Sequence, residues 1–160
     1  MKKLLLFFLL CCIGVGLYLG YDLLRWMKDS YDNQYQLEKI YEVIQPTNHK
    51  LEQPIDWNYL KKINSEVVGW ITVNNTNINY PIVQHNDNSY YLSHSIDQSK
   101  NRGGWIFMDY RNNSKNLNRN TIIYGHDRAD KSMFATLKNV LKEEWYTNKE
   151  NQNFTLWTIN

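Results

Sequence analysis

The chain has 160 residues, of which 42% are hydrophobic and 14% aromatic, enough for one modest folded domain with an appendage. Its 18 Lys and Arg residues are interspersed with 16 Asp and Glu residues, for a net charge of +2, so the basic stripe typical of nucleic-acid-binding proteins is absent. Both cysteines, Cys11 and Cys12, lie in an apolar N-terminal run. Disulfides, Cys-ligated zinc and cysteine nucleophiles are therefore excluded from residues 21–160.

The N-terminal run, Leu4 to Gly20, contains no charged residue and follows Lys2 and Lys3. As a helix it would be roughly 25 Å long at about 1.5 Å per residue, enough to cross a bilayer core with Tyr21 at the interface. A cleaved signal peptide begins in a similar way, but no small-x-small cleavage site follows and the run is long for a signal. We therefore expect a single transmembrane anchor over residues 1–21. Lys and Arg residues are nearly balanced on its two sides, so charge alone does not orient it.

Residues 22–64 are predicted to form membrane-proximal helices and a linker. Apolar residues recur at helical spacing from Asp22 to Ile44, which predicts an amphipathic helix. The following polar stretch, residues 45–54, contains two prolines and is typical of a linker. A second, short helix is expected to begin at Asp56, a residue type that favours the N-cap position.

Beyond Asn64 the apolar period changes from about 3.6 to 2, so residues 65–160 are predicted to be mainly β. A hairpin is expected from residues 67–73 and 77–83, with further strands at 103–110, 121–124 and 153–159, and with a helix of about three turns over 133–145. The last strand is apolar on both faces, which is typical of a central strand. No turn, charge or proline follows it, so we expect a sheet that is cut at this point.

Four histidines are candidates for chemistry, and His126 is the best placed. His49, His85 and His94 lie in the linker or in loops, and we interpret them as solvated. His126 directly follows the apolar stretch 122–124, and Gly125 gives the backbone freedom to turn the ring inward. An ordinary histidine titrates near about 6.5, which suits a general acid or base. Position alone favours a histidine in a surface turn over a catalytic one.

Other reactive sites have weaker support. A zinc site made of His85, His94 and His126 lacks both an H-x-x-x-H pair and a local carboxylate pattern. A nucleophilic Ser93 or Ser132 lacks a G-x-S-x-G turn, and Asp127 would usually point away from the histidine that it follows. The sequence therefore predicts neither a metal nor another cofactor.

Four stretches in this order resemble the class B sortases, the membrane-anchored cysteine transpeptidases of Gram-positive bacteria. They are "INSEVVGWITVNNTNINYPIVQ", "NSYYL", "GGWIFMDYRN" and "NTIIYGHDRADKSMFATLKN". With the anchor and the helices, the similarity covers nearly the whole chain. The resemblance implies a mainly β fold: an incomplete sortase-type β-barrel with about five of eight strands, N-terminal helices and a single transmembrane anchor.

The resemblance also implies a reaction and a location. Sortases attack a sorting-signal peptide with a Cys thiolate, form an acyl-enzyme, and transfer the acyl group to an amine of a cell-wall peptidoglycan precursor or a pilin. In the family the His of the Y-G-H segment is catalytic, here His126, as general acid or base. The N-terminus is expected in the cytoplasm, the anchor in membrane lipid, and the domain outside the cell. No cofactor is implied.

Two catalytic parts of the family have no match in these 160 residues. The family's Cys lies in a T-L-x-T-C segment and its Arg on the strand that follows. Neither segment is found, and the arginines at 102, 111, 119 and 128 do not match. We therefore expect the N-terminal portion of a class B sortase, inactive by itself. The alternatives are a non-catalytic, membrane-tethered extracellular binding or regulatory module, and an OB-like barrel, whose usual basic groove is absent.

Overall fold

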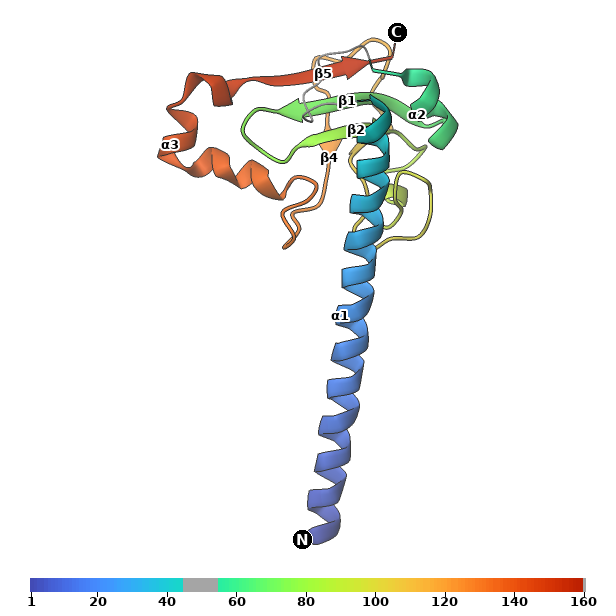
Figure 1. The fold of residues 1–160 in the computed structure, drawn as a ribbon, viewed down its shortest axis with the longest axis vertical. Helices are drawn as coiled ribbons and strands as arrows, with labels where there is room; N and C mark the ends of the chain where they lie inside the picture. The colour runs from blue at the N-terminus through green and yellow to red at the C-terminus, as the bar shows by residue number, and fades with distance from the viewer. Residues whose placement is uncertain (45–54, 160) are drawn as a thin grey trace.

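The computed structural model describes residues 1–44 and 55–159. Its N-terminal part is one helix of 43 residues, α1 (Lys2–Ile44), which projects from a small β domain (Figure 1). The predicted anchor and the predicted amphipathic helix are thus continuous, with no break at the boundary between residues 21 and 22. The predicted linker, residues 45–54, lies outside the described residues.

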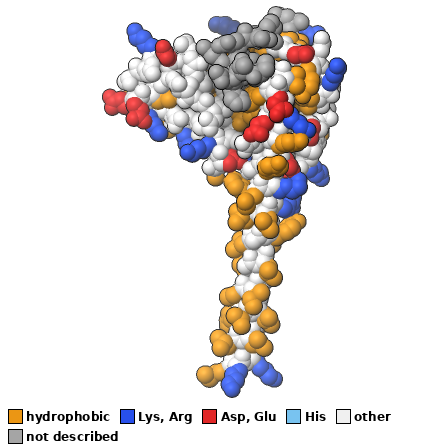
Figure 2. Space-filling model, viewed as in Figure 1, with side chains coloured by type: hydrophobic (Ala, Val, Ile, Leu, Met, Phe, Trp, Pro, Cys, Tyr) orange, Lys and Arg blue, Asp and Glu red, His pale blue; other side chains and the backbone are white. Residues whose placement is uncertain are grey.

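The apolar half of α1 stands clear of the domain. Its best window of 18 residues has a mean hydropathy of 2.3, and none of that window is buried against the rest of the chain. Figure 2 shows hydrophobic side chains around the projecting helix, with lysines at its tip. Within residues 1–44 and 55–159, α1 is the one helix long and apolar enough to cross a membrane.

The domain is built on a five-stranded sheet that curls into half a barrel. The strands are β1 (Val67–Val73), β2 (Asn79–Val83), β3 (Phe107–Met108), β4 (Ile123–Tyr124) and β5 (Phe154–Thr158). Their order is β4-β3-β2-β1-β5, and every neighbouring pair is antiparallel except β2 and β3. The predicted hairpin and the predicted number of strands are confirmed, although β3 and β4 are shorter than expected.

The last strand, expected to be of the central type in a sheet cut at this point, pairs on one side. β5 is an edge of the described sheet and pairs there with β1. Phe154 at its start is 69% exposed. An apolar pattern on both faces reports how much surface a strand is able to bury and does not report how many strands lie beside it.

The single helix predicted over 133–145 is wrong. The structure has a 3-10 helix, η2 (Ala135–Leu141), then one α-helical turn, α3 (Glu143–Tyr146), and a further short 3-10 helix, η3 (Lys149–Gln152). Lys142 is extended, with φ −88° and ψ 132°, and separates the first two. The break lets Leu137 and Trp145 line one cavity together, whereas the sequence pattern assumed a straight helix with one buried face.

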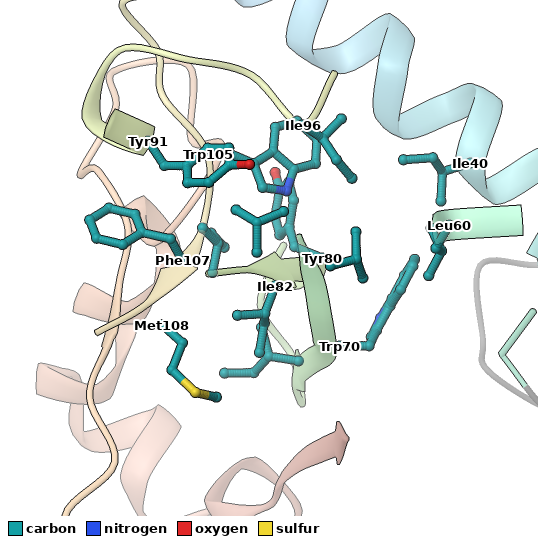
Figure 3. Packing of buried hydrophobic residues seen from close by; sticks show 14 of the residues in the cluster. Ile40, Leu60, Trp70, Tyr80, Ile82, Tyr91, Ile96, Trp105, Phe107 and Met108 are labelled. Carbon is teal, nitrogen blue, oxygen red and sulfur yellow. The ribbon is translucent and has the colours of Figure 1, made fainter. Parts of the chain in front are cut away.

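Two short helices flank the β1–β2 hairpin in the sequence, and the first of them packs against both α1 and the sheet. α2 (Trp57–Ile63) begins as predicted, because the Asp56 carboxylate accepts a hydrogen bond of 2.9 Å from the Tyr59 amide. Figure 3 shows Ile40 of α1, Leu60 of α2 and Trp70 of β1 converging in the core. All three are 0% exposed, and burial of an Ile or Leu side chain contributes about 1.5–3 kcal/mol. The second short helix is η1 (Tyr90–Leu92), a 3-10 turn.

Candidate functional site

The site begins at the end of β4, whose register is fixed by a buried carboxylate. Tyr124 pairs with Phe107 of β3, and its hydroxyl donates to Asp109 at 2.9 Å. Asp109 is 1% exposed and also accepts hydrogen bonds from Asn88 and Arg111. The Arg111 guanidinium holds the pKa of Asp109 well below its usual range. A charged, fully bonded Asp109 therefore fixes the strand that carries His126 two residues later.

His126 is partly exposed, and one ring nitrogen is engaged. Its Nε2 lies 2.9 Å from the carbonyl oxygen of Leu92, at the end of η1. Because a carbonyl only accepts, Nε2 must carry the proton and donate. The neutral ring is therefore the Nε2–H tautomer, and Nδ1 is its basic nitrogen. Within the described part of the chain, Nδ1 makes no hydrogen bond. This arrangement is suited to proton transfer at Nδ1.

The backbone around His126 is fixed by close packing. The Phe134 amide donates to the His126 carbonyl at 3.0 Å. A Cβ added to Gly125 would lie 2.8 Å from Cδ2 of Phe134, so the phenyl ring rests directly on that glycine. The φ of Gly125 is not positive, so this glycine serves close packing and does not supply the backbone freedom that the sequence suggested.

The structure places His85 and His94 differently from our interpretation of them as solvated. Each ring stacks on a face of Tyr90, with centroid separations of 4.2 and 4.0 Å. His85 Nδ1 lies 2.7 Å from a Glu66 carboxylate oxygen, and His94 Nδ1 lies 2.7 Å from the Tyr90 carbonyl oxygen. The two histidines therefore support η1, the element that holds His126. His49 lies outside the described residues.

The alternative sites are not assembled. The Ser132 hydroxyl donates to Asp130, and the Asp127 carboxylate lies 3.4 Å from Lys138 Nζ, so neither side chain engages His126. Among residues 1–44 and 55–159, no three His, Cys, Asp or Glu side chains are grouped to hold a metal ion.

The arginines and cysteines occupy other places. Arg102 pairs with Asp22 and Asp29, Arg111 with Asp109, and Arg128 with Asp130. These three guanidiniums therefore serve structural ion pairs. Cys11 and Cys12 are exposed on the apolar part of α1, outside the β domain that carries His126.

Two cavities lie near the site, and His126 lines neither. The first, about 390 Å³, is apolar and is bounded by β1, β4, η2 and β5. The Trp145 indole N–H is buried in its wall without a hydrogen-bond partner in the described chain. The second, about 370 Å³, separates α1 from the segment 130–133.

Comparison with known proteins identifies the family of this chain. No family model matches the chain. The sortase B of Listeria monocytogenes is 39% identical over 140 residues, which cover 85% of this chain, and the sortase B of Staphylococcus aureus is 34% identical over 148 residues, which cover 91%. The chain belongs to the class B sortases. It spans 57% and 61% of the length of these two relatives.

Solved sortase B structures agree with this assignment. Sortase B from Bacillus anthracis in complex with AAEK1 aligns with a TM-score of 0.72 and 41% identity, over 82% of this chain and 63% of that one. A Staphylococcus aureus sortase B–substrate complex aligns with a TM-score of 0.66 and 32% identity, over 82% of this chain and 59% of that one. The five-stranded half-barrel with its N-terminal helices is therefore a sortase B fold.

Several residues that support His126 were missed from the sequence. The Leu92 carbonyl is a backbone group, so its residue type gives no signal. Gly104, with φ +58°, is packed beside the imidazole, and no sequence pattern assigned it a role. Asn33 lies within the predicted amphipathic helix, whose apolar pattern assigned it no role, although it is 5% exposed. The spacing of Asn33 along the helix from Ile40, seven residues or two turns, was the available signal.

Proposed function

We propose that this chain provides the membrane anchor and the histidine-bearing part of a class B sortase that acts as a cysteine transpeptidase. The observation that carries the proposal is the held tautomer of His126, with Nε2 donating to Leu92 and Nδ1 available for proton transfer. The substrates are a sorting-signal peptide and an amine of a peptidoglycan precursor or a pilin. The family membership and the substrate complex of a relative support this choice of substrates.

The proposed reaction has two halves. A Cys thiolate attacks the scissile carbonyl carbon, the C–N bond breaks, and the imidazolium of His126 gives its Nδ1 proton to the leaving amine. An incoming amine then attacks the thioester, neutral His126 accepts its proton at Nδ1, and the thiolate leaves. An Arg would donate hydrogen bonds to the oxyanion in both halves.

The thiolate and that Arg lie outside residues 21–160 in this proposal. The sequence places its two thiols in the apolar part of α1, and Arg102, Arg111 and Arg128 are engaged in ion pairs. We therefore expect a polypeptide of these 160 residues alone to form no acyl-enzyme.

The proposed location is the cell membrane, with α1 spanning the lipid once, the N-terminus in the cytoplasm and the domain outside. The exposed apolar surface of α1 supports a place in lipid. The Arg102 guanidinium donates to Asp22 at 2.6 Å and to Asp29 at 3.0 Å, which ties the domain to α1 just after its apolar run. The active site would therefore operate close to the membrane surface.

Acylation measured by intact mass tests the proposal. A completed chain joins residues 1–160 to the remaining C-terminal part of the Listeria sortase B, and both forms are incubated in detergent micelles with a panel of sorting-signal peptides. We expect the mass of the peptide's acyl part to be added to the completed chain and not to the 160-residue chain. An adduct on Cys11 or Cys12, or a folded completed chain that stays unmodified, would contradict the proposal.

A further inference from the structure

The imidazole of His126 rests on the backbone of Gly104. A Cβ added at Gly104 would lie 2.9 Å from Cδ2 of His126 and 3.0 Å from the Leu92 carbonyl oxygen that the ring binds. The φ of +58° at Gly104 brings its backbone to this position. The place of Gly104 therefore decides how closely His126 approaches its acceptor.

Gly104 is in turn held by a side chain of the membrane helix. Asn33 of α1 donates from Nδ2 to the Gly104 carbonyl at 3.0 Å and to Asn101 Oδ1 at 3.3 Å. Its Oδ1 accepts from the Ser95 hydroxyl at 2.6 Å. Asn33 is 5% exposed, so losing these bonds would leave buried polar groups without partners.

A second contact ties the other side of His126 to the same helix. Arg128, two residues after His126 and 8% exposed, donates to the Ser30 hydroxyl at 2.5 Å, and its guanidinium lies 5.7 Å from the centre of the Trp26 ring. Trp26, Ser30 and Asn33 are spaced four and three residues apart and share one helix face. Gly103 lies between the two contacts, since a Cβ there would be 2.5 Å from Arg128 and 2.8 Å from Asn33.

A cavity separates α1 from the domain beside Asn33. The cavity of about 370 Å³ lies between α1 and the segment 130–133, lined by Ser30 and Asn33 on one side and Asp130 and Met133 on the other. Apolar packing is therefore interrupted beside Asn33, whereas Ile40 two turns along the helix is fully buried. The hydrogen bonds of Asn33 must then supply the alignment that side-chain packing supplies elsewhere.

We propose that Asn33, supported by Ser30 through Arg128, is a positioning residue for His126. By holding Gly104 against the imidazole, the membrane helix keeps Nε2–H on the Leu92 carbonyl and leaves Nδ1 as the basic nitrogen. The catalytic value of this alignment rests on the proposed function of His126. The alignment itself does not, so it is measured without any reaction.

The test uses ring-¹⁵N-labelled histidine in the 160-residue chain in micelles, at about pH 8.5, where an ordinary imidazole is neutral. The shifts of the two ring nitrogens report the tautomer, and the spectrum of His126→Ala identifies the His126 signals. In the unmodified chain we expect the Nε2–H tautomer. In Asn33→Ala we expect the ratio of Nε2–H to Nδ1–H to fall about fivefold, the change expected when one hydrogen bond is lost.

Gln36→Ala is the matched control, because Gln36 also donates from α1 to the domain, at 2.9 Å to Asp97, but has no contact with Gly104. Its tautomer ratio should stay unchanged. If Asn33→Ala does not fold, Asn33→Ser and Ser30→Ala replace it. In both variants we expect a smaller fall in the ratio of Nε2–H to Nδ1–H. An unchanged tautomer in the folded variants, or an equal change in Gln36→Ala, overturns the proposal. Failure of acylation in the completed chain would leave this result standing, so the two proposals fail separately.

Discussion

Replacement of Gly104 by alanine should destabilise the domain and displace His126. The φ of +58° disfavours an L-residue by about 1 kcal/mol. The new Cβ would also lie 2.5 Å from the Tyr91 carbonyl oxygen and 3.0 Å from that of Leu92, both backbone atoms. Relieving such contacts costs about 2 kcal/mol, within the usual range for overpacking. We therefore expect a loss of about 3 kcal/mol in the free energy of unfolding, a large part of the ordinary stability of a domain.

Urea unfolding followed by tryptophan fluorescence measures this loss, since Trp70 and Trp105 are buried and report the core. Gly20→Ala is the matched control, because a Cβ there meets nothing within 4 Å and alanine suits the interior of α1, so the unfolding midpoint should not fall. A loss below about 1 kcal/mol in Gly104→Ala, with the His126 signals in place, would refute the reasoning, because both the backbone cost and the overpacking cost would then be absent.

Two further predictions concern buried polar groups. Partial burial raises the pKa of Asp130, but hydrogen bonds from Arg128, Ser132 and Ser30 outweigh it and hold the pKa well below its usual range. Its stabilising effect is therefore complete above about pH 4 and is lost as the pH falls through the folded-state pKa, so the urea midpoint should drop in acid, and less steeply in Asp130→Asn. A midpoint whose acid dependence is identical in the variant contradicts this. Asn64→Ala removes bonds of 2.7 Å to the Tyr91 hydroxyl and the Ile96 carbonyl, and should cost about 2 kcal/mol in the same assay; a neutral result would show that these groups find other partners.

The helices and the hairpin could be predicted from local signals. Asp56 in the N-cap position and the change of period near residue 64 are statements about neighbouring residues, and the structure confirms both elements. The apolar run at the N-terminus likewise predicted a helix, although its continuity up to Ile44 depends on packing of the last turns against the domain. Elements that follow from periodicity and capping were therefore recovered.

Features set by distant residues were not recovered. The helical break at Lys142 lets the chain line a cavity whose walls include β1 and β5. The residues near 142 carry no sequence signal for this break. The environment of His126 depends on the Leu92 carbonyl and on Asn33, which lie 34 and 93 residues away along the chain. His85 and His94 were misread for the same reason, since only the fold brings them to the two faces of Tyr90. His126 was visible in the sequence as a candidate, whereas the residues that support it were not.

The single-turnover rate of acylation in the completed chain tests the role of His126 most directly. His126→Ala should lower this rate about 10²–10⁴-fold, the usual contribution of a positioned acid or base, and the fold should be preserved by near-ultraviolet circular dichroism. His49→Ala, the same substitution at another of the four histidines, should keep the full rate. A folded His126→Ala variant that acylates as fast as its His49→Ala counterpart would contradict the account.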